Sequence, residues 1–278
     1  DRVYIEYNGL LSAADEAGPV AQAAMDALEA GKGWRALHLP GIASDDPLLA
    51  ASNVRRKVRR DVRPSYFVGL DAVRSGGDYL SLLSSNTRSQ VRRALRECGV
   101  DPGGLEVARA GSVDGVDAWM AGMEAMNRGR FEDNAWDIPL FRTFVAELAR
   151  RGMENGEVDL LRISAGERVL GYLVNFVYRG RAMNYQSARP DPVGPKDKPG
   201  LLCHVAAVER YAGLGLNLYS FLAGDHRYKQ SLATGAEQLE WWVLERFSPR
   251  LEAERLLRQL LGRPLGGSSS EAAQGDAA

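Results

Sequence analysis

The chain has 278 residues, of which 45% are hydrophobic and 26% charged, a composition typical of a soluble globular protein with one large or two ordinary domains. Its formal net charge of −1 excludes a global field for nucleic acid or membrane, so such binding would need a local patch. Cys98 and Cys203 lack disulfide or metal-ligand spacing, and the sequence has neither a leader pattern nor an apolar run of about 18 residues. We therefore expect a cytoplasmic protein without a transmembrane segment.

The first third of the sequence alternates strand and helix signals. Apolar and β-branched runs predict strands at residues 3–9, 34–42 and 64–70, and intervening segments predict helices at 15–30 and 46–57. This alternation predicts an α/β fold whose mixed sheet has some parallel pairing.

A longer helix is expected at residues 77–98, where apolar residues recur near helical spacing and leave one packed face and one basic face. The next segments read as a strand at 105–111 and as two helices at 113–130 and 138–152. Helices therefore dominate the middle of the chain.

After Gly156 the sequence pattern changes to a period of two. Runs at 158–164, 168–180 and 182–188, separated by short turns, predict an antiparallel meander. The expected elements that follow are a helix at about 200–213, a strand at 216–222, a helix at 226–234, a strand at 237–245 and a helix at 249–261. The Gly- and Ser-rich end, residues 263–278, predicts a disordered tail.

Several familiar catalytic motifs are missing. The sequence has no GxxxxGK[ST], HExxH or GxSxG, and the glycines at 213–216 close a helix where a dinucleotide motif would open one. His38, His204 and His226 are too scattered for a metal centre, so we expect no metal. Cys203 and His204 should point to different faces of one helix, which argues against a Cys-His nucleophile pair.

The loop-to-helix junction KDKPGLL, residues 196–202, is a candidate anion site. Pro199 begins the helix, Gly200 lets a ligand approach the backbone, and the next amides are free to bind an anion such as a diphosphate. Lys196 and Lys198 add positive charge beside it. An ordinary Pro-initiated helix with solvated lysines is the alternative.

Basic residues gather in VRRKVRRDVR, residues 54–63, and in the helix that carries Arg88 and Arg92. These two arginines are four residues apart and share a helix face, so they could grip a phosphate. Together with Asn8 they are the candidate substrate-binding residues, with a nucleotide-linked sugar or an RNA backbone as the ligand. A solvated charged face is the alternative.

The stretch FLAGDHRYKQSL, residues 221–232, places reactive side chains where a strand gives way to a helix. Carboxyl ends of strands and helix N-termini often share a ligand crevice, so Asp225, Tyr228 and Lys229 are candidate site residues. A solvated helix cap would explain the same pattern.

Residues 105–245 resemble the GNAT superfamily of N-acyltransferases in their order of elements. More narrowly, YLSLLSSNTRSQVRRALRE, GYLVNFVYRGRAMNYQSARPDP and the run from Lys198 to Lys229 resemble CelD-type acyltransferases of cellulose and exopolysaccharide synthesis, relatives of the Fem aminoacyl-transferases. The resemblance covers roughly residues 1–247. It implies a GNAT fold with an N-terminal GNAT-like lobe at 1–98 and a C-terminal acyltransferase domain at 99–262.

The resemblance also implies roles for particular residues. An acyl-CoA, most simply acetyl-CoA, would be the co-substrate, with its pantetheine arm along strand 182–188 and its pyrophosphate at the start of the following helix. Asp225 would act as base through water, Tyr228 would protonate the thiolate, and Lys229 matches a lysine of the Fem relatives. The residues implied for the co-substrate are Tyr185, Gln186, Ser187, Lys198, Pro199, Gly200, Leu201 and Leu202.

One position departs from the resemblance, because related sequences commonly carry an acidic residue where this chain has Ser220. The expected acceptor is an amine, such as an amino sugar of a cell-surface polysaccharide precursor linked to a nucleotide or lipid. A Fem-type transferase that uses aminoacyl-tRNA is one alternative, and the only one that involves nucleic acid. A non-catalytic binding module that keeps the fold is another.

Overall fold

The computed structural model describes residues 5–101, 103–130 and 134–260, and within them the chain forms two compact units. The first unit contains the described residues up to Pro64 and those from Gln238 onward, and the second contains Ser65–Glu237. Strands β2 (Arg56–Gly69) and β8 (Gly235–Glu245) contribute residues to both units.

The lobe boundary expected after residue 98 lies inside the second unit. Residues just before it belong to helix α4 (Ser85–Glu97), whose Val91, Ala94 and Leu95 share a hydrophobic core with the rest of the second unit. This shared apolar core holds the segment in the second unit. The expected tail at 263–278 lies outside the described residues.

In the first unit, helices α1 (Ala17–Ala30) and α2 (Pro47–Ala51) pack on strand β1 (Ala36–Ala43) and on β8. A short 3-10 turn, η1 (Ala14–Glu16), precedes α1, and helix α9 (Pro249–Leu260) ends the described chain. The strands β1 and β8 are antiparallel. The apolar contacts that join these elements are made by Met25, Leu39, Ile42, Leu48 and Leu244.

Two expectations for the first unit were wrong. Residues 5–9, within the expected strand 3–9, form no strand; Asn8 Nδ2 instead donates hydrogen bonds to the carbonyls of Ile5 and Pro40, each at 2.7 Å. The helix expected at 46–57 ends at Ala51, and the basic run that follows belongs to β2. Asp46 caps α2, and the alternating residues of the basic run suit a strand.

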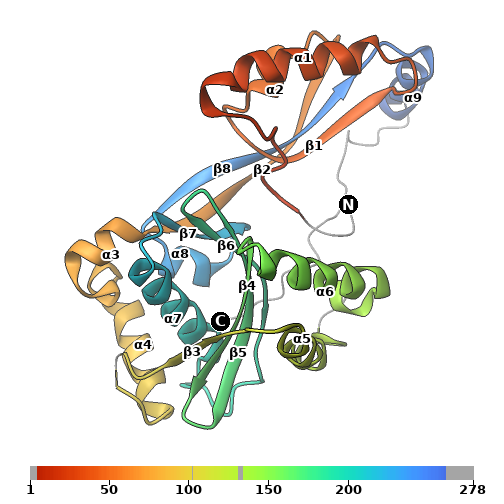
Figure 1. The fold of residues 1–278 in the computed structure, drawn as a ribbon. Helices are drawn as coiled ribbons and strands as arrows, with labels where there is room; N and C mark the ends of the chain where they lie inside the picture. The colour runs from red at the N-terminus through yellow and green to blue at the C-terminus, as the bar shows by residue number, and fades with distance from the viewer. Residues whose placement is uncertain (1–4, 102, 131–133, 261–278) are drawn as a thin grey trace. The chain divides into compact units, whose positions relative to one another are not determined.

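The second unit is a mixed sheet with helices on both sides (Figure 1). Its strands follow the order β2-β7-β6-β5-β4-β3, and the meander β4-β5-β6 is antiparallel as expected. Helices α5 (Val113–Asn127) and α6 (Pro139–Glu154) lie on one side, and α7 (Pro199–Gly213) lies on the other with α3 (Leu70–Gly76) and α4. The remaining elements are β3 (Glu106–Arg109), β4 (Val158–Ala165), β5 (Arg168–Tyr178), β6 (Arg181–Ala188), β7 (Leu218–Ala223), α8 (Arg227–Leu232), η2 (Tyr79–Leu82) and η3 (Ala135–Asp137).

The helix expected at 77–98 begins later, at Ser85. The hydroxyl of Ser84 accepts a hydrogen bond from the Thr87 amide at 3.2 Å and caps α4, and the preceding residues form the short turn η2. A side-chain cap of this kind supplies an acceptor to an otherwise unpaired amide of the first turn. The sequence SSNT therefore fixes where the helix starts.

Helix α7 is the central helix of the second unit. Most of its residues are buried, including Leu202, Val208 and Tyr211, because it lies between the sheet and helices α3 and α4. Burying a side chain such as Leu202 fully contributes roughly 1.5–3 kcal/mol. The burial fixes the helix start at Pro199 relative to β6.

The two parallel strands β6 and β7 pair over a short distance only. Their ladder joins Arg181–Met183 to Leu218–Ser220 and then ends, although β6 continues to Ala188. The register of β5 with β6 also shifts between Val174 and Asn175, opposite Tyr185. Residues 184–188 therefore lie beyond the parallel ladder with β7.

Strand β7 has an irregularity of its own at the point where the ladder ends. Its register with β2 slips between Ser220 and Ala223, and Leu222 adopts a left-handed backbone with φ 60°. A non-glycine residue in this conformation is strained by about 1–3 kcal/mol, and such bulges often re-aim a strand end. The hydroxyl of Ser220 accepts the Leu222 amide at 3.1 Å and stabilises the bulge.

Candidate active site

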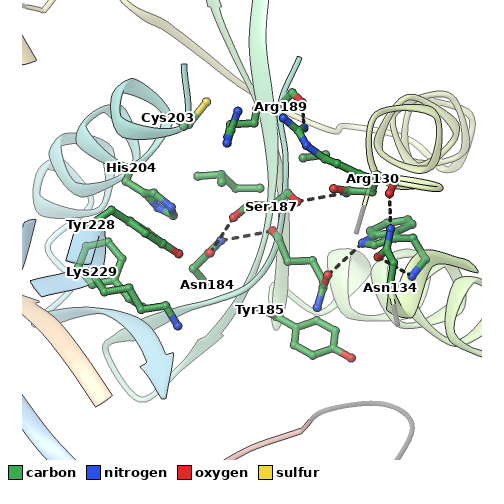
Figure 2. A pocket seen from close by; sticks show the side chains of 17 residues that line it. Arg130, Asn134, Asn184, Tyr185, Ser187, Arg189, Cys203, His204, Tyr228 and Lys229 are labelled. Atoms are coloured by element: carbon green, nitrogen blue, oxygen red, sulfur yellow. Dashed lines mark hydrogen bonds between the residues drawn. The ribbon is translucent and has the colours of Figure 1, made fainter. Parts of the chain in front are cut away.

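A cavity of about 100 Å³ lies in the second unit where β6 and β7 part (Figure 2). It is bounded by the end of β6, the first turns of α7, the junction of β7 and α8, and the segment between α5 and α6. The 17 lining residues are Asn127, Arg130, Asn134, Trp136, Leu173, Asn184, Tyr185, Gln186, Ser187, Ala188, Arg189, Gly200, Cys203, His204, Phe221, Tyr228 and Lys229.

Lys229 brings a buried positive charge to the cavity. Its side chain is 1% exposed, and Nζ donates a hydrogen bond to the carbonyl of Ala223 at 2.7 Å. Ala223 directly follows the bulge at Leu222, so the strained strand end and the ammonium group fix each other's position. An ammonium held in this way can stabilise negative charge that develops on a substrate oxygen.

Tyr228 and His204 stack beside Lys229. Their ring centroids are 5.5 Å apart with an interplanar angle of 18°, and both rings line the cavity. Burial raises the pKa of Tyr228 despite an opposing effect of Arg189, so the phenol stays protonated and can donate a proton.

His204 is held neutral. Burial first, and then the nearby charge of Lys229, lower its pKa to about 3. Its Nδ1 lies 2.9 Å from the Tyr219 hydroxyl. An imidazole with so low a pKa is a weak base at neutral pH, and its ring instead supports the Tyr228 ring by stacking.

Cys203 and His204 both line the cavity, although their neighbouring positions on α7 were expected to separate them. Side chains one residue apart on a helix diverge by about 100°, and the cavity spans that angle. Burial raises the pKa of the Cys203 thiol to about 12, so the group stays a thiol at neutral pH. The structure thus disfavours a cysteine nucleophile because of burial rather than helix geometry.

Beside Arg130, the α5–α6 side of the cavity carries neutral polar groups, Asn127 and Trp136, that sequence reasoning missed. Asn127 Nδ2 donates to the Ser187 carbonyl at 3.2 Å, and Trp136 Nε1 donates to Gln186 Oε1 at 3.0 Å. Ser187 Oγ donates to Asn184 at 2.9 Å. Asn127 and Trp136 lie far from any recognisable motif, and only the fold brings them to β6.

The charged residues that line the cavity are all cations. Arg130, Arg189 and Lys229 line it, and none of the lining residues within the described chain is Asp or Glu. Burial, and then the adjacent Arg130, lower the pKa of Arg189. The cavity therefore favours substrates, or transition states, that carry negative charge.

Within the described chain, no side chain caps the N-terminus of α7. Lys198 precedes the first turn and makes no side-chain cap hydrogen bond, and Gly200 lines the cavity. The amide of Leu202 donates to the Lys198 carbonyl at 3.2 Å, so the first-turn amides of Gly200 and Leu201 are the better candidates for an anion. The side chains of Leu201 and Leu202 belong to the core.

The loop before α7 is held by an ion pair. Asp197 accepts hydrogen bonds from Arg168 at 2.5 Å and from the Val193 amide at 2.9 Å. Burial alone would raise the pKa of Asp197, but these two donors outweigh it and the pKa lies below its usual value. The loop is thereby fixed next to the first turn of α7.

The structure brings together some of the residues expected at the site. Tyr185, Gln186, Ser187, Gly200, Tyr228 and Lys229 line one cavity. Lys198, Pro199, Leu201 and Leu202 flank it at the helix start without lining it.

Other expected site residues lie away from the cavity lining. Asp225 is exposed and accepts a hydrogen bond from the Tyr66 hydroxyl at 3.2 Å. Arg88 donates to the Ser81 carbonyl at 3.4 Å, and Arg92 is exposed on α4. Asn8 belongs to the first unit, where it binds backbone carbonyls. Their functional roles stay predictions.

Ser220, the position where related sequences commonly carry an acid, is fully buried and outside the cavity lining. Its hydroxyl lies 3.4 Å from the hydroxyl of Ser65 on β2. The serine therefore has a structural function at the bulge of β7.

The part of the chain that the structure describes has neither a metal-binding type of cluster nor a helix suited to cross a membrane. No group of three or more His, Cys, Asp or Glu side chains within residues 5–260, apart from the gaps, is arranged to hold a metal ion. In the same part of the chain, no helix has both the length and the apolar character needed to cross a membrane.

Comparison with known proteins identifies the family. Residues 85–230, more than half of the chain, match the acetyltransferase (GNAT) domain family. The protein belongs to this family and is a GNAT-domain acyltransferase. The comparison with curated proteins finds no significant match.

Solved structures share the fold over most of the chain. The C-terminal domain of a putative lysylphosphatidylglycerol synthetase from Agrobacterium fabrum has a TM-score of 0.58 and 11% identity, covering 90% of this chain and 79% of that one. L-PGS from Bacillus licheniformis has a TM-score of 0.56 and 11% sequence identity, and the match covers 90% of this chain and 80% of that one. FemX has a TM-score of 0.55 and 12% sequence identity, and the match covers 88% of this chain and 78% of that one. Similarity at these identities concerns the fold alone.

Proposed function

We propose that the protein is an N-acyltransferase that moves an acyl group, most simply acetyl, from acyl-CoA to an amine. The main support is the parting of β6 and β7 after Met183 and Ser220, which leaves strand edge 184–188 beside the first turn of α7. A thioester arm could pair with that edge while its diphosphate meets the helix N-terminus. The cavity residues fit such a donor.

The donor would supply an activated thioester, and the chain's residues would hold it. The amides of Gly200 and Leu201 are suited to the diphosphate, with Lys198 adding charge, and β6 from Asn184 to Ala188 is suited to the arm. The register shift between β5 and β6 falls at Tyr185, and such an irregularity would aim this part of the strand toward the reacting carbonyl.

Acyl transfer needs a neutral amine, because an ammonium has no lone pair. Three lining cations would lower the pKa of an acceptor ammonium and help it to lose its proton, although no carboxylate is found among the described lining residues. In the transfer the amine nitrogen bonds to the acyl carbon and the C–S bond breaks. Lys229 would stabilise the oxyanion and Tyr228 would protonate the departing thiolate, while the proton that the acylated nitrogen loses would return through water to the phenol.

The test is a binding and turnover measurement on a matched pair of glycine variants at the two ends of α7. Gly200→Val places a side chain at the proposed diphosphate site, whereas Gly213→Val lies where an added Cβ meets nothing within 4 Å. We expect acetyl-CoA to raise the melting temperature of the wild type and of Gly213→Val, and to bind at least tenfold more weakly to Gly200→Val, roughly 1.4 kcal/mol.

Release of free thiol from acetyl-CoA in the presence of amino-sugar acceptors would establish turnover and exclude a non-catalytic module. We further propose an amino-sugar acceptor and a role in exopolysaccharide synthesis. Comparing turnover among different acceptors tests both. If acetyl-CoA neither binds nor is consumed, acyl-CoA is the wrong donor.

A Fem-type aminoacyl transfer is the second candidate. It is supported by the fold shared with FemX and with lysylphosphatidylglycerol synthetase domains over about nine-tenths of this chain, and by the buried Lys229. Such an enzyme would bind aminoacyl-tRNA with a steep dependence on salt. Salt-sensitive tRNA binding together with no stabilisation by acetyl-CoA would favour this candidate.

A further inference from the structure

Two guanidinium groups meet at one end of the cavity, and Lys229 lies at the other end (Figure 2). Arg189 directly follows β6, and Arg130 comes from the segment after α5. Like charges close together repel each other, and after the larger effect of burial this repulsion by Arg130 also lowers the pKa of Arg189. An arrangement of this kind is relieved when an anion binds between or beside the two groups.

Arg130 is fixed by the protein. Its Nη1 donates to the Arg189 carbonyl and its Nη2 donates to Asp191, each at 2.6 Å. Asp191 is highly exposed, with 89% of its side chain accessible, so its carboxylate compensates the charge only weakly. Arg130 therefore reaches the end of β6 from the α5–α6 side in a defined position.

Arg189 differs from Arg130 in having an unused donor. Its Nη1 is buried and has no hydrogen-bond partner among the described residues. A buried guanidinium N–H without an acceptor is unfavourable, and it is normally satisfied by protein, water or ligand. No carboxylate lines the cavity among the described residues, so within them this donor lacks a charged acceptor that a bound anion would supply.

We infer that the acceptor substrate carries an anionic oxygen group, a carboxylate or a phosphate, which Arg189 binds with help from Arg130. The inference rests on the proposed acyl transfer and names the class of its acceptor: an acidic amine rather than a neutral one. Arg130 approaches from the α5–α6 side, whereas the donor is proposed to lie along β6 toward α7, so the two substrates would approach from different elements. A planar guanidinium with a free N–H suits such a group.

The same arginine chemistry would also suit the donor's own diphosphate, so the experiment separates the two sources. Inorganic phosphate is titrated into the full chain with and without saturating acetyl-CoA, and binding is followed by calorimetry. We expect phosphate to bind the donor-loaded protein and Arg189→Gln to bind it at least tenfold more weakly. Phosphate that binds only in the absence of acetyl-CoA would assign the arginine to the donor and overturn the inference.

A matched control comes from the other end of the same strand. Arg181 begins β6 and pairs with Glu237 at 3.1 Å outside the cavity, so Arg181→Gln should bind phosphate as the wild type does. Equal loss in both variants would show a nonspecific charge effect and overturn the inference. Arg189→Lys keeps the positive charge but lacks the planar guanidinium, so it should bind phosphate more tightly than Arg189→Gln and more weakly than the wild type. Melting curves check that each variant is folded.

A turnover measurement tests the acceptor class directly. Glycylglycine and glycylglycinamide present the same amine but differ in charge at the far end. We expect the wild type to favour the acid and Arg189→Gln to lose that preference. Transfer to both acceptors at equal rates, unchanged in the variant, would refute the acidic acceptor while leaving acyl transfer intact. If acetyl-CoA does not bind, the proposed acyl-CoA donor is refuted, whether or not phosphate binds.

Discussion

The cavity of the second unit and the part of strand β2 that belongs to the first unit both concentrate positive charge, but their charged groups differ in how far they are paired. Arg59 lies 3.0 Å from Glu240, and Arg56 and Arg60 lie within 4 Å of Glu245. In the cavity, by contrast, Arg189 retains an unpaired Nη1 and no carboxylate lines the wall within the described chain. Charge density alone therefore does not mark a site, whereas an unpaired charge facing a cavity does.

Aromatic contacts reinforce this difference in the first unit. Arg59 lies over Trp242 at 6.0 Å and Arg63 over Trp241 at 5.2 Å from the ring centroids. Cation–π contacts at exposed positions contribute about 0.5–1 kcal/mol each. The arginines of β2 are thus largely accounted for by partners in their own unit, which weakens the expectation that residues 54–63 bind RNA or a nucleotide.

The largest expected effect is on turnover and comes from Lys229→Met. The variant removes the buried ammonium and keeps a side chain of similar length, so it should lose oxyanion stabilisation and the bond to Ala223. We expect kcat to fall by roughly 10²–10³-fold, on the scale of one lost oxyanion donor. Steady-state kinetics with acetyl-CoA measures this. A drop of less than threefold in a folded variant would remove Lys229 from catalysis.

Acid stability should depend on His204. Its pKa falls from 6.5 to about 3 on folding, so between these values the unfolded state binds a proton that the folded state does not. Stability from this group is complete above pH 6.5 and is lost as the pH falls, by about 2 kcal/mol at pH 5. His204→Gln should abolish that loss, measured by urea unfolding at pH 5 and pH 7.5.

The control for His204 is the same substitution, His→Gln, at the exposed His38 of β1. If His204→Gln retains the full loss of stability between pH 7.5 and pH 5, the imidazole is not held neutral in the folded protein. Comparing each variant with itself at two pH values cancels the pH-independent effect of losing the contact with Tyr219.

Tyr228→Phe should reduce kcat by about tenfold, because the hydroxyl would protonate the leaving thiolate while the ring keeps its stacking on His204. Asp225→Asn provides the comparison, since its carboxylate is exposed and outside the cavity lining. We expect a change of less than twofold for Asp225→Asn. A hundredfold loss of kcat in Asp225→Asn would instead support Asp225 as the general base. Full activity of Tyr228→Phe would show that water, not the phenol, protonates the thiolate.

The smallest effect is expected in the first unit. Arg59→Gln removes the partner of the buried Glu240, which keeps its hydrogen bond from Trp242 at 2.7 Å. Because Arg59 is 54% exposed, we expect only about 0.5–1 kcal/mol of destabilisation and no change in acyl transfer. Urea unfolding and kinetics measure both. A loss of turnover would show that the charged strand does contribute to substrate binding.

Local patterns were sufficient to predict much of the second unit. The period-two runs after Gly156 predicted the meander, and Pro199 with Gly200 predicted the start of α7. The stretch containing Tyr228 and Lys229 was expected at a site because it follows a strand directly. These features depend on neighbours in the sequence, which is why one sequence reveals them.

The remaining features depend on contacts between distant segments. Asn127 and Trp136 reach the cavity only because α5 and α6 pack beside β6. Arg189 became a candidate only because the structure shows its buried Nη1 without a hydrogen-bond acceptor among the described residues. Burial, not position, separates Lys229 from the exposed Asp225, four residues earlier. The strand over residues 56–63 was missed because its pairing with β8 is tertiary information.

The bulge at Leu222 also indicates how this enzyme could be re-engineered. Phe221, Ala223 and Lys229 take their positions from a strained strand end that Ser220 stabilises, so random changes across 220–223 should mostly inactivate the protein. The α5–α6 wall carries side chains on a different segment, away from that strained turn. Libraries that seek new acceptors should therefore vary Asn127, Arg130 and Asn134 and keep the end of β7 unchanged.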